Sequence, residues 1–135
     1  AFRHRIGGGM IARVFMVAVL ALANVAAAPP VLAQGETQTI ASSDGVYLRG
    51  LDKISGVTTD LAVAVGESIS FGRMEIALIA CRYPVEEAAA EAYAFLEITD
   101  ETRGERLFYG WMIASSPALN ALDHARYDVW VIGCQ

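Results

Sequence analysis

The hydrophobic positions after residue 45 recur with the two-residue period of β-strands. The clearest strand is expected over residues 73–81, where one face is apolar and the other is mostly polar. The apolar face consists of Met74, Ile76, Leu78 and Ala80. Cys81 falls on the opposite face with Arg73 and Glu75, and Pro84 should end the strand.

Shorter runs of the same kind predict five further strands. They cover residues 46–50, 61–65, 91–98, 107–113 and 127–134. The 91–98 strand should turn Tyr93 and Phe95 away from the face that contains Leu96. In the last strand apolar residues occupy both alternating sets of positions, so both of its faces should be buried.

Two stretches between these strands have helical character. Residues 85–92 combine glutamates with a run of alanines, which favours a helical turn. Ser116 followed by Pro117 is typical of a helix N-terminus, so residues 118–122 should form a short helix. The whole pattern indicates a mainly β fold, a single compact antiparallel sandwich or barrel with one short helix.

The first 33 residues have the three parts of a secretory signal peptide. Their apolar run over residues 14–28 is shorter than the ~20 residues of a membrane span. Three arginines precede this run: Arg3, Arg5 and Arg13. Val31 and Ala33 fit the two small-residue positions that a signal peptidase reads, so cleavage is expected after Ala33.

The expected mature protein is periplasmic. Met10 directly precedes the apolar run and is the expected true start of the chain. Retention of the apolar run as an anchor helix is the alternative to cleavage. The expected layout is a signal peptide over residues 1–33, a flexible lead-in over 34–45 and a single β domain over 46–135.

Removal of the signal peptide leaves a strongly acidic chain. All 15 acidic residues lie after residue 33, whereas three of the ten basic residues lie before it. The remaining net charge is −8, which repels a phosphate backbone and argues against a nucleic-acid partner. No cysteine directly follows the expected cleavage site, which argues against a lipid anchor.

Cys81 and Cys134 are the only cysteines, and both lie in the expected mature domain. In an exported chain an even cysteine count indicates a disulfide. The bond would bring the two strands within ~4.4–6.8 Å of each other at their Cα atoms. A redox or metal-binding pair is the alternative, but the sequence lacks a Cys-x-x-Cys spacing.

Catalytic chemistry finds weak support. Ser115, Ser116, Asp123, His124 and Asp128 supply the residue types of a hydrolase triad. No Gly-x-Ser-x-Gly turn surrounds either serine, and a serine before proline is commonly a helix cap. We therefore expect no enzyme activity.

A metal site is equally short of ligands. His124 is the one histidine of the expected domain, and bonded cysteines do not bind zinc. Met74 and Met112 offer copper ligands beside His124, but methionines in strands usually fill the core. The acidic pairs at 86–87 and 100–101 lack the spacing of a calcium loop. We expect neither a metal nor another cofactor.

Four aromatic residues allow a sugar- or peptide-binding groove: Tyr109, Trp111, Tyr127 and Trp130. The same residues also suit the core and rim of a small β domain, which is the favoured interpretation.

Motifs along the domain match one family pattern. They are Leu48-Arg49-Gly50-Leu51-Asp52-Lys53, Gly66-Glu67, Phe71-Gly72, Cys81, Gly110-Trp111-Met112, Ala114-Ser115-Ser116-Pro117-Ala118-Leu119-Asn120, Tyr127-Asp128-Val129-Trp130 and Cys134. Together they resemble the exported bacterial family catalogued as domain of unknown function 2155. Ile113 stands where the family usually has Phe, and His124-Ala125 where it has His-Pro.

The resemblance implies a small envelope protein of a bacterial group related to mitochondria, but it does not imply any particular activity. Genes of the family often lie beside one for an accessory subunit of respiratory NADH dehydrogenase. The resemblance therefore implies a protein partner in the cell envelope and makes a periplasmic accessory subunit of that membrane complex a specific hypothesis.

Two functions from different classes remain open. The first is a non-catalytic protein-interaction or structural module, whose candidate residues are Trp111, Met112, Ser115, Ser116, Pro117, Asn120, His124, Tyr127, Asp128 and Trp130. The second is a small ligand-binding or hydrolytic domain that uses Ser115, Ser116 and His124. Convergence of His124 and a serine hydroxyl in one pocket would favour the second.

Overall fold

The computed structural model describes residues 25–32, 35 and 37–135. The chain divides into residues 1–34 and a compact unit over Gly35–Gln135. Residues 25–32 are exposed and have no regular secondary structure. Most of the expected signal peptide, Met10 and the expected cleavage position lie outside the described residues. In the described part of the chain, no helix has the length and apolar character needed to span a bilayer.

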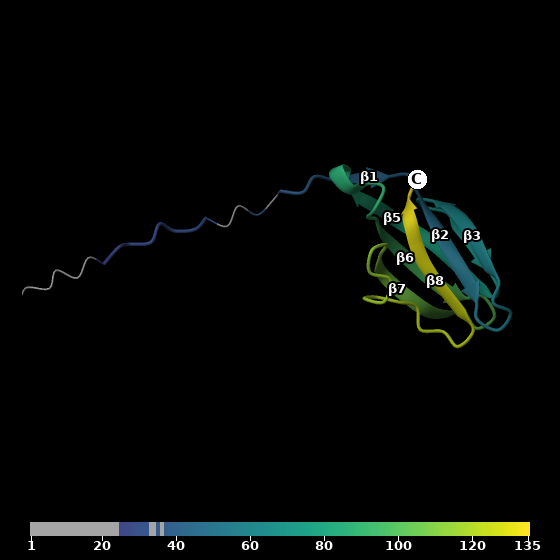
Figure 1. Cartoon of the computed structure of the whole chain (residues 1–135). Coiled ribbons are helices and arrows are strands. Elements are labelled where there is room, and N and C mark those ends of the chain that lie inside the picture. Colours follow the sequence, from purple (N-terminus) through teal and green to yellow (C-terminus); the bar gives the residue numbers. More distant parts are fainter. Residues whose placement is uncertain (1–24, 33–34, 36) are drawn as a thin grey trace, which may run out of the picture. The chain divides into compact units, whose positions relative to one another are not determined.

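The compact unit consists of two antiparallel sheets that share one core (Figure 1). Its elements are β1 (Ile40–Ser43), β2 (Gly45–Asp52), β3 (Thr58–Ala64), β4 (Ser68–Phe71), β5 (Met74–Pro84), the 3₁₀ helix η1 (Val85–Glu87), β6 (Tyr93–Asp100), β7 (Glu105–Ile113) and β8 (Tyr127–Cys134). The five-stranded sheet has the order β1-β5-β6-β7, with β4 also paired to β5. The three-stranded sheet has the order β3-β2-β8. The predicted mainly β sandwich is confirmed.

Two connections move the chain from one sheet to the other. β1 pairs with the C-terminal half of β5, and after Asp44 the chain continues as β2 in the other sheet. β3 pairs with β2, and the chain then turns at Gly66 into β4, which pairs with the N-terminal half of β5. These short connections join the two sheets covalently.

The core lies between the sheets and is formed by alternate residues of the long strands. Its inward side chains include Leu48 of β2, Ile76 of β5, Leu96 of β6 and Val131 of β8, all nearly inaccessible to solvent. Ala94 and Ile98 are buried beside Leu96, as the alternation of the 91–98 segment predicts. Burial of apolar area at about 25 cal/mol per Å² makes this core the main stabilising element.

The predicted faces of β5 are wrong beyond Leu78. Leu78 pairs with Leu96 and Ala80 with Phe95, so Ile79 is an extra residue on β5. Such a bulge reverses the alternation that follows it. Cys81 consequently points into the core instead of sharing the outer face with Glu75.

Because the bulge turns Cys81 toward the core, Cys81 can form a disulfide with Cys134, and the Cα atoms of the two residues are 5.9 Å apart. Cys81 belongs to β5 in one sheet and Cys134 to β8 in the other. The predicted pairing is confirmed, and the bond crosses from sheet to sheet.

Other expectations differ from the structure. Residues 118–120 form a turn and a bend, and 121–122 have no regular secondary structure, so the expected helix is absent there. The helical element among the described residues is η1, within the stretch 85–92 that favoured a helical turn. Only one face of β8 is buried, because Ile132 is exposed and Trp130 half-buried. Part of the expected lead-in over 34–45 is strand β1, and β4 is a strand that the sequence pattern did not indicate.

Candidate functional site

The candidate residues of the sequence analysis separate into core, loop and surface positions. Met112 is a residue of β7 that is only 3% exposed and packs in the hydrophobic core, so its side chain is not available at the surface to bind a ligand. Asp128 is half-buried on β8 opposite Leu51. Pro117 is exposed in the loop between β7 and β8.

Ser115 is tied to the start of β6 by Glu91. The Ser115 amide donates to Glu91 Oε1 at 3.1 Å, and its hydroxyl donates to Oε2 of the same carboxylate. The amide of Ala92 donates to Oε1 at 3.0 Å. Partial burial raises the pKa of Glu91, but the three donated hydrogen bonds outweigh it and the pKa is lowered. The carboxylate therefore fixes the loop after β7 to the segment before β6.

Ser116 takes part in a turn and does not cap a helix. Its amide donates to the carbonyl of Ile113 at 3.2 Å, and its carbonyl accepts from the amide of Leu119 at 3.1 Å. Further along the loop, Asn120 Nδ2 donates to the carbonyl of Trp111 at 2.8 Å. Asn120 thereby holds the loop against β7, which is a structural role.

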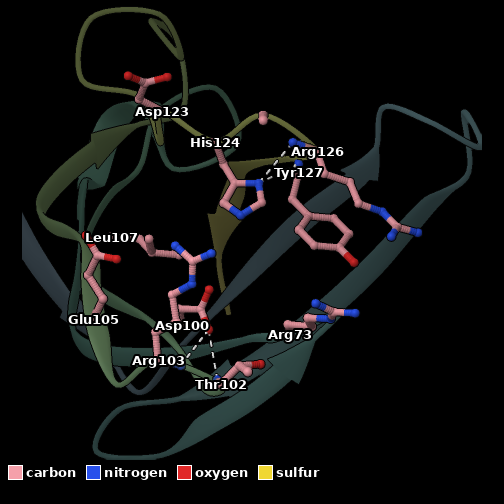
Figure 2. A pocket seen from close by; sticks show the side chains of 11 residues that line it. Arg73, Asp100, Thr102, Arg103, Glu105, Leu107, Asp123, His124, Arg126 and Tyr127 are labelled. Atoms are coloured by element: carbon pink, nitrogen blue, oxygen red, sulfur yellow. Dashed lines mark hydrogen bonds between the residues drawn. The ribbon is translucent and has the colours of Figure 1, made fainter.

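His124 lies at the opposite end of this loop and has a fixed ring. Its Nδ1 accepts hydrogen bonds from the amides of Arg126 at 3.0 Å and Tyr127 at 3.1 Å. The ring is directed into a hollow of about 510 Å³ (Figure 2). Neither Ser115 nor Ser116 lines this hollow, and no hydrogen bond in the described residues joins either serine to His124. The triad ingredients are therefore not assembled into a catalytic arrangement here.

Tyr127 is a core residue at the same end of the molecule. Its ring meets the edge of Phe71 at a centroid distance of 5.4 Å. Gly72 has a positive φ of 59°, and a Cβ at this position would lie 2.5 Å from the Tyr127 hydroxyl. The glycine is required here both by the backbone conformation and by the close approach of the ring.

The four aromatic residues considered for a groove do not come together. Tyr127 is buried, and Trp130 belongs to β8 in the three-stranded sheet, paired with Arg49. Tyr109 and Trp111 belong to β7 in the other sheet. A groove that joins all four is therefore absent, and the two residues of β7 have other neighbours.

Those neighbours are Tyr93 and Phe95 of β6, which join Tyr109 and Trp111 on the outer face of the five-stranded sheet. Phe95 is paired with Trp111 across the strands. The Phe95 ring meets Tyr109 edge-on at 4.9 Å and Trp111 at 5.2 Å. We call Tyr93, Phe95, Tyr109 and Trp111 the aromatic stripe. The alternation in 91–98 had placed the two β6 residues on an outer face, but their link to β7 depends on the strand register.

Two arginines stack on the aromatic stripe. The guanidinium carbon of Arg106 lies 4.3 Å from the Tyr109 ring centroid, and that of Arg82 lies 5.3 Å from the Trp111 ring. A shallow hollow of about 380 Å³ adjoins Trp111 and is lined by Ile40, Arg82, Tyr93, Trp111 and Ile113. The stripe is thus a partly exposed aromatic surface with cationic groups, suited to stacking and to apolar contact.

Metal ligands are not grouped in the described residues. No set of three or more His, Cys, Asp and Glu side chains there is placed to hold an ion. Both cysteines are bonded to each other. The chemistry on offer at the surface is therefore that of hydrogen bonding, stacking and charge.

Comparisons with known proteins identify a bacterial family. A family model described as an uncharacterized protein conserved in bacteria (DUF2155) matches residues 46–134. The uncharacterized protein RP359 of Rickettsia prowazekii (strain Madrid E) is 29% identical over an alignment of 87 residues, and the match covers 62% of this chain and 56% of the relative. The chain thus spans little more than half the length of that relative. No solved structure matches.

Proposed function

Since the chain belongs to DUF2155, a family of bacterial proteins, we propose that it is a non-catalytic protein-interaction module of the periplasm. The observation that supports this function is the aromatic stripe with its two stacked arginines. The partner is a protein of the cell envelope, contacted through the outer face of β6 and β7.

The composition of this face departs from that of an ordinary solvated sheet. Outward positions of an antiparallel sheet are usually polar. Here Phe95 and Trp111 occupy directly paired outward positions, and Tyr109 is 53% exposed. Tyrosine, tryptophan and arginine are the residues that most often provide the binding energy of protein interfaces.

The side chains of the stripe also contact one another and their neighbours in the protein alone. Phe95 is held between two edge-on rings, and Arg106 is held both by Tyr109 and by Glu97 at 3.4 Å. Side chains that are already fixed lose less conformational entropy on association. An ordered aromatic surface therefore binds more tightly than a mobile surface of equal area.

The charge of Arg82 indicates which kind of protein surface would complement the aromatic stripe. Arg82 has no carboxylate within ion-pair distance in the described part of the chain. Its guanidinium lies beside the apolar hollow at Trp111. A protein surface that places a carboxylate next to an apolar side chain complements this arrangement.

Two observations support a periplasmic location. The disulfide between Cys81 and Cys134 suits an oxidising compartment, and the first 33 residues have the pattern of a signal peptide. The family resemblance adds a specific partner, respiratory NADH dehydrogenase, with this protein as an accessory subunit on its periplasmic side.

Affinity purification tests this function. The tagged full chain is expressed in its bacterium, recovered from detergent-solubilised membranes, and compared with Trp111→Ala and with Trp130→Ala. The second variant removes a half-buried tryptophan from the outer face of the other sheet and is the matched control. We expect wild type and Trp130→Ala to enrich NADH dehydrogenase subunits over a mock purification, and Trp111→Ala to lose at least tenfold of that enrichment.

Thermal unfolding of all three proteins shows whether each is folded. Recovery of monomer alone, without enrichment of the membrane complex, would refute the partner. Equal enrichment by the folded Trp111→Ala variant would refute the aromatic stripe as the contact surface.

A further inference from the structure

A second, chemically different surface lies at the end of the sandwich where β4, β6 and β7 meet the start of β8. The hollow of about 510 Å³ there is formed by three segments (Figure 2): Arg73 after β4, then Asp100, Thr102, Arg103, Glu105 and Leu107 around the β6–β7 turn, and residues 123–127 before and within β8. Its size is within the range of small-molecule sites. None of these residues belongs to the aromatic stripe.

The walls of this hollow are joined by hydrogen bonds. The amide of Glu101 donates to the carbonyl of Arg73 at 2.8 Å, which fixes the β6–β7 turn to β5. Across the hollow, the amide of Lys53 donates to the carbonyl of Arg126 at 2.8 Å, and Lys53 Nζ donates to the carbonyl of His124 at 2.6 Å. The segment before β8 is therefore anchored to the β2–β3 hairpin, and the hollow has a defined shape.

His124 presents a hydrogen-bond donor to this hollow. Because Nδ1 accepts from two backbone amides, it bears no proton, and the neutral ring must have its proton on Nε2. The ring lies against Tyr127 at a centroid distance of 5.2 Å, which fixes its plane. Figure 2 shows the free edge of the ring turned toward the guanidinium of Arg103.

Two of the charged side chains around the hollow already have partners. Arg126 is paired with Asp52 at 3.0 Å. The carboxylate of Asp100 accepts the amides of Thr102 at 2.8 Å and Arg103 at 3.0 Å. Arg126 and Asp100 therefore stabilise the walls of the hollow, and the contacts with a ligand are assigned to the other charged side chains.

The other four charged side chains have no such partners. Arg73, Arg103, Glu105 and Asp123 line the same hollow, yet within the described residues none of them lies within ion-pair distance of an opposite charge. In Figure 2, Glu105 and Asp123 lie at the left and top, Arg103 is central and Arg73 lies to the right. Two cations and two anions thus line a space large enough for a small molecule.

From this arrangement we infer that the hollow binds a small zwitterion, an amino acid or a short peptide. Its carboxylate lies against Arg103 and the Nε2–H of His124, and its ammonium group against Glu105. Planar guanidinium groups match carboxylates well. A polyanion such as phosphate is disfavoured, because three carboxylates line the hollow.

NMR titration of the full, oxidised, ¹⁵N-labelled protein tests this site. Glycylglycine and an equimolar mixture of the twenty amino acids are the zwitterionic probes; acetate, ethylamine and inorganic phosphate have only one kind of charge. We expect saturable shifts of the amides at 100–107 and 123–127 with a zwitterionic probe. The three control probes should bind at least tenfold more weakly.

Variants locate the site. Arg103→Gln should weaken zwitterion binding at least tenfold, whereas Arg106→Gln, three residues away and outside the hollow, should bind as wild type. Both arginines are exposed, and dispersed amide spectra show that each variant is folded. Absence of saturable shifts, equal binding of acetate or phosphate, or unchanged binding by Arg103→Gln would each overturn the proposal. Trp111→Ala should bind the zwitterion normally, so failure here is distinct from failure of the interaction function.

Discussion

Reduction of the disulfide between Cys81 and Cys134 is the perturbation with the largest expected effect on stability. The bond spans 53 residues of sequence and joins the two sheets of the core. It restricts the unfolded chain, and its removal returns conformational entropy to that state. The folded state, by contrast, keeps its buried apolar side chains.

The magnitude follows from the length of the closed loop. For this separation the chain-entropy argument gives about 4 kcal/mol. A single domain is stable by only about 5–15 kcal/mol in total. At about 4–8 °C per kcal/mol for a domain of this size, the midpoint of thermal unfolding should fall by roughly 20 °C.

Urea and thermal unfolding, followed by circular dichroism with and without a phosphine reductant, measure this loss. The double variant Cys81→Ala/Cys134→Ala is the control: it should unfold near the reduced protein, and reductant should not affect it. A reduced protein as stable as the oxidised one would refute the reasoning, since the bond would then not lower the conformational entropy of the unfolded chain.

Gly72→Ala should lower the free energy of unfolding by about 1–3 kcal/mol, because its positive φ and the contact with Tyr127 exclude a Cβ; an unchanged urea midpoint would contradict this. Met112→Ala should cost about 2–5 kcal/mol as a core truncation, whereas a residue of a surface site would leave the midpoint unchanged. The hydrogen bond from Arg126 lowers the pKa of Asp52 from 3.8 to about 2. The ionised Asp52 carboxylate therefore contributes its full stabilisation above pH 3.8, and this contribution is lost as the pH falls through about 2. In Arg126→Gln, carboxyl NMR should find the pKa of Asp52 nearer 3.8.

Local sequence pattern was sufficient to predict the strands that bury a full apolar face. Leu96 and its alternate neighbours form the apolar face of their strand, so that face was expected to point into the core. The disulfide could be predicted because a chain with two cysteines allows only one pairing. The bulge at Ile79 was not predictable, because it depends on the register between β5 and β6. β1 and β4 escaped detection since each is four residues long and owes its conformation to pairing with β5.

The short helix at 118–122 failed for a related reason. Ser116 and Pro117 favour a helix start locally, but Asn120 bonds to the carbonyl of Trp111 and binds the segment to β7. Tertiary contacts of this kind override weak helix propensity. The candidate sites were harder to predict from the sequence than the helix. The aromatic stripe depends on the β6–β7 register, and the hollow at His124 is formed by three segments that are distant in sequence.

The central position of β2 between β3 and β8 has a consequence for the order of folding. Its pairing Val46↔Cys134 joins opposite ends of the domain, so the smaller sheet stays incomplete until β8 is available. Contacts this distant in sequence form slowly, because a long loop must close first. The smaller sheet should consequently be completed only when nearly all of the nascent polypeptide has been made.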